Sequence, residues 1–219
     1  MTETRQRLID GALETLRDKG MAATSARTIA AAASANQGLI FYHFGSVDQL
    51  IIEACRVSTE QRVQHYRQRF AAVGSLRELL GIGRELHATE LAAGNVTVLA
   101  QVVAGAQQNE AFAAAGREAI EQWIAEIERV LRRLLRGSPI APAVDQPGLA
   151  RGIAAAFIGI ELYDGVDAGG AQAALAALEQ LSVLAEVLDD LGPVARRAVR
   201  SRVRKAQART PGPRPAGAP

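Results

Sequence analysis

Two very short helical segments between residues 24 and 44 constrain this chain more than any other feature of its sequence. The first follows Thr24 and Ser25 and the second follows Asn36, all three being residues favoured at helix N-caps. Helices of about two turns are not stable alone in water. Neighbouring helices must therefore hold them, which predicts a small, tightly packed helical unit near the N-terminus.

Longer helical patterns surround this pair. From about residue 4 to residue 19 apolar residues recur at the spacing of an amphipathic helix, and Gly20 ends the pattern. The run from Ser46 to Gln49 is typical of a capping box and begins a long helix toward Phe70.

The rest of the chain repeats the helical pattern. Helices are expected over residues 110–136, 149–166 and 171–191, with a proline-containing loop over residues 137–148. No sustained alternation of apolar and polar residues marks a strand. The sequence thus predicts an all-α protein.

Charge is distributed unevenly along the chain. Of 25 basic residues, eight follow Gly192, where no acidic residue occurs. The preceding part carries the other 17 together with all 23 acidic residues, a net charge of −6. Bulk charge therefore does not indicate nucleic-acid binding, and any such function must rest on local chemistry.

We expect a cytoplasmic protein with no membrane partner. The apolar stretches, such as residues 152–160, are shorter than the about 18 residues of a membrane span. The charged N-terminus does not fit a signal peptide. Cys55 is the single cysteine, which excludes an intrachain disulfide and is more typical of a small core residue than of a redox sensor.

The two short segments match the spacing of a helix-turn-helix, in which the second helix enters the DNA major groove. Thr24, Ser25 and Arg27 are suited to phosphates. Gln37, in the first turn of the second segment, is suited to base edges, and Tyr42 to phosphates. The alternative is that these are polar residues on the exposed face of an ordinary helical bundle.

The stretch from Thr24 to Ser46, followed by Leu50, resembles the TetR (tetracycline repressor) family of bacterial transcriptional regulators. The motif covers about the first 55 residues; the remainder is similar only in being helical and of the right length. The resemblance implies that residues 37–39 approach bases and that other polar residues of the stretch hold phosphates. The candidate DNA-binding residues are Thr24, Ser25, Arg27, Asn36, Gln37, Gly38, Leu39, Tyr42 and His43.

Three positions depart from the family pattern. Ser34 stands where the family usually has glycine, in a turn expected to need a positive φ. Phe41 replaces a tyrosine and Val47 a lysine, which removes two phosphate partners from each subunit and predicts weaker or less salt-dependent DNA binding. Arg5 and Arg7 are candidate replacements.

No motif for catalysis, metal or nucleotide binding is present, and we expect neither an enzyme nor a cofactor. The three histidines do not have zinc-site spacing. Glu161 and Asp164 lie one helical turn apart and can act as a pair in a small-molecule enzyme. The preferred interpretation is that they are polar residues near the end of a buried helix.

The last two long helices carry a candidate dimer interface. One offers small residues that permit close helix approach and the other a leucine stripe, so two copies can form a four-helix bundle. The alternative is that both stripes are satisfied within one subunit. The candidate interface residues are Gly152, Ala155, Ala156, Gly159, Leu178, Leu181, Leu184 and Leu188.

The middle helices combine bulky side chains with gaps at Gly81 and Gly83, a pattern that fits a pocket of mixed character. The family resemblance implies an effector site there, whereas the alternative is ordinary core and surface. The candidate pocket residues are Leu86, His87, Glu90, Val103, Gln107, Phe112, Trp123 and Phe157.

We therefore expect a three-helix, helix-turn-helix head over residues 1–46, a helical effector-binding and dimerisation domain over 47–192, and a basic, disordered tail over 193–219. The expected function is a homodimeric, ligand-responsive repressor that a small-molecule effector releases from its double-stranded DNA operator. The effector would bias the long helix that begins at Ser46. The alternative is a helical ligand- or protein-binding module with a vestigial DNA-binding head.

Overall fold

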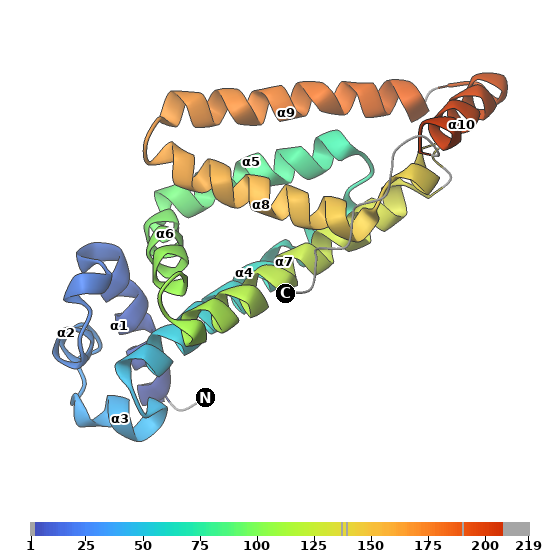
Figure 1. The fold of residues 1–219 in the computed structure, drawn as a ribbon. Helices are drawn as coiled ribbons and strands as arrows, with labels where there is room; N and C mark the ends of the chain where they lie inside the picture. Colours follow the sequence, from blue (N-terminus) through green and yellow to red (C-terminus); the bar gives the residue numbers. More distant parts are fainter. Residues whose placement is uncertain (1–2, 137, 139, 190, 208–219) are drawn as a thin grey trace, which may run out of the picture.

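The computed structural model describes residues 3–136, 138, 140–189 and 191–207. In those residues every regular element is a helix, as the sequence predicts. Figure 1 labels the α-helices, and two short 3-10 helices, η1 and η2, lie between them. The elements are α1 (Glu3–Lys19), η1 (Met21–Ala23), α2 (Ala26–Ala32), α3 (Gly38–Phe44), α4 (Val47–Ala72), α5 (Leu76–Ala92), α6 (Asn95–Ala106), α7 (Glu110–Leu134), η2 (Ala141–Ala143), α8 (Gln146–Asp164), α9 (Ala168–Asp189) and α10 (Pro193–Gln207).

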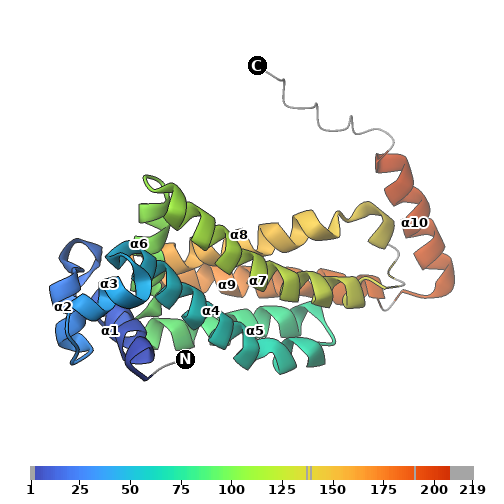
Figure 2. The same ribbon diagram turned by 90° about the horizontal axis from the view of Figure 1, so that it is seen from below.

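The helices form a small head and a larger body. Helices α1 to α3 make the head at one end, and α10 lies at the opposite end (Figures 1 and 2). Helix α4 runs from the head into the body beside α7, and α6 stands between the head and the other body helices (Figure 1). None of the described helices is long and apolar enough to cross a membrane.

The head has its own apolar core. Side chains from α1, α2 and α3 meet the first turns of α4, and Ile29, Ile40 and Leu50 are fully buried there. Gly11 lets α1 approach α2 closely, because a Cβ at this position would lie 2.9 Å from the Ala33 backbone nitrogen. The two seven-residue helices are thus held by packing rather than by their own propensity.

The body core lies between α4, α5, α7 and α8. The Trp123 ring packs near Tyr66 and Phe70, with ring centroids 6.3 Å away in each case. Arg133 closes the end of α4 because its Nη2 donates hydrogen bonds to the Phe70 and Val73 carbonyl oxygens at 2.8 and 2.9 Å. Carbonyls that would be left unpaired at a helix C-terminus are satisfied in this way.

A third apolar cluster joins the head to the body, and we call it the joint. It consists of Leu16 from α1, Ile51 from α4, Val98 from α6 and Phe112 from α7. All four side chains are buried. Four helices therefore meet where the head is attached.

Two predicted boundaries are wrong. Helix α8 begins at Gln146, inside the predicted loop, because Asp145 accepts a hydrogen bond from Gly148 N at 3.2 Å and Pro147 is tolerated in a first turn. Helix α9 begins at Ala168 because Asp167 accepts a hydrogen bond from Gly170 N at 2.9 Å. In both places a capping aspartate outweighs the loop signal of nearby proline or glycine.

The prediction of a disordered tail from residue 193 is wrong for residues 193–207, which form α10. Proline is favourable at a helix start, and Val199 and Val203 on one side are partly buried. Residues 208–219 lie outside the described part of the chain.

Ser34 has the positive φ expected from the sequence. Its φ of 48° is the only positive value at a non-glycine residue in the described ranges. Such a conformation brings Cβ close to a carbonyl oxygen and costs roughly 1 kcal/mol or more.

Replacing Ser34 with glycine should raise the free energy of unfolding by about 1 kcal/mol, because glycine has no Cβ to strain. Urea unfolding followed by circular dichroism measures this change. The matched control is Ala35→Gly, next to it, which lacks a positive φ and should instead lower stability. A destabilising Ser34→Gly substitution would contradict the assigned strain.

Candidate functional site

Helix α3 exposes one face of the head. Gln37 and Gly38 are exposed, Tyr42 is 81% exposed, and His43 is partly exposed. On the opposite side Ile40 is buried, and Leu39 packs partly against the head core. The candidate base-reading and phosphate-binding side chains of α3 are thus brought together on one accessible surface.

Asn36 organises the start of α3. Its Oδ1 accepts a hydrogen bond from Gly38 N at 2.8 Å, so this side chain satisfies one of the first amides, as expected of a capping residue. The helix itself begins at Gly38, and Gln37 occupies the position before it. This arrangement places Gln37 at the very tip of the exposed face.

The residues that lead into α2 are held by local hydrogen bonds. Thr24 Oγ1 donates to the Gly20 carbonyl at 2.7 Å, and Ser25 Oγ accepts from Thr28 N at 3.3 Å. These bonds fix the turn and engage both hydroxyls inside it. Arg27 is exposed beside them and is the cation that the turn presents to solvent.

Phe41 was not among the predicted site residues, yet its ring is 53% exposed on α3. An exposed apolar side chain on such a helix can contact a thymine methyl group. The signal was present in the sequence, because three aromatic residues in four positions cannot all be buried by a two-turn helix. Val47, in place of the family's lysine, packs partly into the head core instead of reaching outward.

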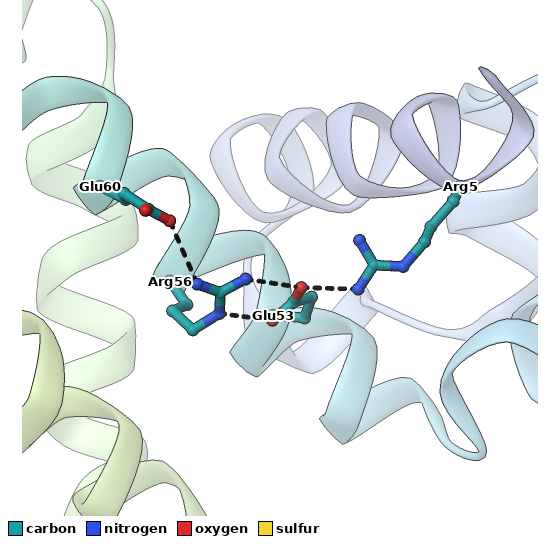
Figure 3. Close-up of polar contacts among 4 residues, drawn as sticks. All are labelled: Arg5, Glu53, Arg56 and Glu60. Carbon is teal, nitrogen blue, oxygen red and sulfur yellow. Dashed lines mark hydrogen bonds and ion pairs between the residues drawn. The ribbon is translucent and has the colours of Figure 1, made fainter. Parts of the chain in front are cut away.

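The guanidinium of Arg5 already contacts other side chains of the protein, which makes it a poor replacement for the missing phosphate contacts. Its Nη2 lies 2.6 Å from Glu53 Oε1, and its guanidinium lies 5.0 Å from the centroid of the Phe44 ring. Figure 3 shows Arg5 reaching from α1 to α4. Arg7 is exposed and stays a candidate.

Glu53 is the centre of the ion-pair network in Figure 3. Its carboxylate accepts from Arg56 Nε at 2.7 Å and Nη2 at 2.9 Å, and Arg56 also reaches Glu60 at 3.2 Å. These hydrogen bonds, first from Arg56 and then from Arg5, lower the pKa of Glu53 to about 2. The network ties α1 to α4 at the outer edge of the head.

A cavity of about 800 Å³ lies inside the body, with walls from α1 and from α4 to α9. Most wall side chains are apolar, and a Cβ on Gly83 would lie 3.9 Å from the Phe157 ring, an ordinary van der Waals contact. Seven of the eight candidate pocket residues line it, namely Leu86, Glu90, Val103, Gln107, Phe112, Trp123 and Phe157. His87 is not part of the wall and lies behind it.

A buried polar cluster borders this cavity, and the sequence did not predict it. His87 Nδ1 lies 3.0 Å from Glu161 Oε1, and His87 Nε2 lies 3.3 Å from Asp164 Oδ1. Glu161 is only 1% exposed and is part of the wall. Burial raises the pKa of Glu161, and the neighbouring His87 acts in the opposite direction. Glu161 and Asp164 therefore lie on either side of one histidine rather than against each other.

Neither metal nor thiolate chemistry has a site in the described ranges. No group of three or more histidine, cysteine or acidic side chains there is arranged to hold a metal ion. Cys55 lines the cavity, and burial raises its pKa to about 11, which keeps the thiol protonated at neutral pH.

Helix α6 connects the cavity to the head. Its Val98, Val102 and Val103 line the cavity. Its Gln101 Oε1 accepts a hydrogen bond from Met21 N, and Gln101 Nε2 donates to the Leu16 carbonyl at 3.3 Å. A single helix therefore touches both the cavity and the end of α1.

The candidate dimer face is accessible in the single chain. Gly152, Ala155, Ala156 and Gly159 are all exposed on α8, and Leu178 on α9 is partly buried. Val183 and Val187, further along α9, are exposed apolar residues. The side chains of Leu181, Leu184 and Leu188 lie outside the described residues.

Comparison with known proteins connects the head to a family. Residues 8–54 match the model of a family described as bacterial regulatory proteins, tetR family. No curated protein matches the chain in sequence.

Solved structures resemble most of the chain. Salmonella enterica GusR is 22% identical with a TM-score of 0.69, and the match covers 83% of this chain and 95% of that one. The regulator FadR from Bacillus subtilis in complex with stearoyl-CoA is 13% identical with a TM-score of 0.69, covering 81% and 97%. A proposed regulator from Saccharomonospora viridis in complex with choline is 20% identical with a TM-score of 0.65, covering 87% and 95%. At these identities the likeness shows the shared fold.

Replacing Glu53 with glutamine should lower stability at pH 7 by up to about 1 kcal/mol, because it removes charge from a partly exposed network. The folded-state pKa near 2 lies below the ordinary value of 4.5, so this contribution is complete above pH 4.5 and fades toward pH 2. Denaturant unfolding of both proteins across this pH range measures it. A stability difference that grows as the pH falls would contradict the assignment.

Proposed function

This chain is a TetR-family DNA-binding transcriptional regulator, and we propose that it is a homodimeric repressor that a small molecule releases from its operator. The observation that carries the proposal is the head. Residues 8–54 match the family model, and α3 presents an exposed reading face on a rigid apolar core. Regulators of this family are not enzymes, and the buried acid pair needs no catalytic role.

We assign base reading to the exposed tip and face of α3. Gln37 can pair bidentately with adenine, Gly38 lets the backbone approach the groove, and Phe41 can contact a thymine methyl group. Leu39, partly buried, contributes at the edge of this face.

Phosphate contacts are assigned to the rim of the head. Arg27 and Tyr42 are exposed and suited to direct contacts, and His43 lies beside Tyr42 with ring centroids 4.9 Å apart. Thr24 and Ser25 act through the turn they fix. Such contacts position a protein on DNA without selecting its sequence.

Dimerisation through α8 and α9 would complete the DNA reader. The exposed small residues of α8, such as Ala155 and Gly159, allow a second copy to approach closely. Paired recognition helices must sit about 34 Å apart to enter successive major grooves. A two-fold dimer at the body end of the molecule would hold two heads at a fixed separation.

The cavity supports a small-molecule effector. Its volume of about 800 Å³ and its apolar walls are typical of ligand sites. Regulators of similar fold are seen in complex with choline and with stearoyl-CoA. A ligand that pushes α6 would act on Leu16 and Met21 through Gln101 and so reorient the head.

The division into domains of residues 1–46 and 47–192 stays a proposal. The refinement is that α4 contributes to both of them. Helix α4 has 26 residues and is about 39 Å long. Its Leu50 and Ala54 belong to the head core, whereas Tyr66 and Phe70 belong to the body core. This helix is therefore shared, and it can transmit movement between the two parts.

Gln37→Ala should reduce the preference for the operator by about 10- to 100-fold with little change in the salt dependence, because a base contact is lost. Tyr42→Ala should instead weaken binding to all duplexes. Fluorescence anisotropy against the DNA upstream of the chain's own gene and a scrambled duplex, at several salt concentrations, measures both effects. Gln64→Ala, exposed on α4 within the body, is the matched control.

The same titration decides between the repressor and the alternative of a binding module with a vestigial head. A specific regulator prefers its site by about 10³-fold or more over unrelated DNA. Equal, weak and salt-sensitive binding to every duplex tried, including a pool of random sequences, would favour the binding module. In that case Gln37→Ala and Tyr42→Ala would change nothing.

Gln101→Ala should loosen the head without touching α3. Losing two hydrogen bonds at a partly buried place should speed amide exchange at Met21 by about tenfold. Hydrogen exchange followed by NMR measures this, with Gln108→Ala, exposed just after α6, as control. Unchanged exchange at Met21 would show that α6 does not hold the head.

A further inference from the structure

The wall of the cavity contains a buried carboxylate that has no adequate partner. Glu161 is 1% exposed, and neither of its carboxylate oxygens accepts a hydrogen bond of good geometry from the described residues. His87 Nδ1 lies within 3.0 Å of one oxygen but is not aligned to donate to it. A buried polar group without a hydrogen bond is costly, so a place like this needs an explanation.

The positively charged groups around Glu161 do not balance its negative charge. On α5 and α4, Glu90 is paired with Arg62, which makes that pair neutral. On α5 and α8, His87 stands between Glu161 and Asp164, so even a protonated His87 balances only one of the two carboxylates. The cluster therefore carries an excess negative charge when its carboxylates are ionised.

The rest of the cavity is suited to an apolar molecule. The wall that contains Glu161 also contains apolar side chains such as Leu86, Ile153 and Phe157, and Trp123 provides an aromatic face. The other charged wall residues are Glu90 and Arg62, which pair with each other, and Arg117 and Glu121, which are exposed and of opposite sign. A ligand with a long or bulky hydrocarbon body and one polar end fits this distribution.

We propose that the cavity takes an apolar molecule carrying a protonated amine, whose N–H groups donate to the Glu161 carboxylate. This inference rests on the proposed function and names the chemical class of its effector. An ammonium group supplies the hydrogen bonds that Glu161 lacks and the charge that its surroundings lack. A carboxylate or phosphate ligand would instead add a like charge beside Glu161.

The chain contains one tryptophan, Trp123, which lines the cavity and so reports on its occupation. The test is a fluorescence titration of the full-length protein with four probes of equal chain length: decylamine, decyltrimethylammonium, decanol and decanoate. Decylamine should bind at least about tenfold more tightly than the other three, because it alone combines positive charge with N–H donors.

Glu161→Gln should remove most of this preference, lowering decylamine affinity about tenfold while leaving decanol affinity unchanged. Glu85→Gln, an exposed glutamate on α5, is the matched control and should have no effect. Glu90→Gln tests whether Glu90 instead of Glu161 binds the amine. It should lower decylamine affinity less than Glu161→Gln does. Thermal melts confirm that each variant is folded; the neutral amide should not destabilise a site where a carboxylate is unpaired.

Tighter binding of decanoate, equal binding of decyltrimethylammonium, or a decylamine affinity that Glu161→Gln does not change would each overturn the proposal. Binding of none of the four probes would overturn it too. The proposed function can fail separately. If decylamine binds through Glu161 but does not change operator affinity, the ligand class stands and release by this ligand does not. If operator binding is specific but no amine binds, the DNA-binding function stands and the ligand class does not.

Discussion

The joint of Leu16, Ile51, Val98 and Phe112 is the packing constraint on which the rest of the structure depends. The head contains two seven-residue helices that cannot stand alone, so tertiary contacts must hold it in shape and place. The joint takes one side chain from each of four helices, three of which belong to the body and also wall the cavity. Anything that moves those helices therefore moves the head.

The distribution of charge along the chain makes DNA binding depend on where the head is placed. Residues before Pro193 carry a net charge of −6, and the basic helix α10 lies at the end opposite the head (Figures 1 and 2). Long-range attraction to phosphates is therefore weak near α3, and Arg5 is held by Glu53. The proposed DNA binding therefore relies on short-range contacts of the exposed α3 face and of Arg27. In the proposed dimer, contacts of this kind would be lost when the two heads change their separation.

Much of this could be predicted from the sequence where local rules dominate. N-cap residues and apolar spacing predicted the helical head, and a serine in a glycine position predicted the positive φ of Ser34. The start of α8 was missed because a capping aspartate competed with Pro147 in a short stretch. The approach of His87 to Glu161 was missed because it joins α5 to α8 across the core, and no local pattern encodes such a pairing.

Reciprocal linkage between cavity and head is the most direct test. The dissociation constant for the operator is measured with and without saturating decylamine. The dissociation constant for decylamine is measured with the free protein and with the operator-bound protein. We expect both constants to rise by the same factor, about 5- to 150-fold, since coupling free energy is shared. Decylamine that occupies the cavity, as reported by Trp123, yet leaves operator affinity unchanged would contradict coupling through the joint.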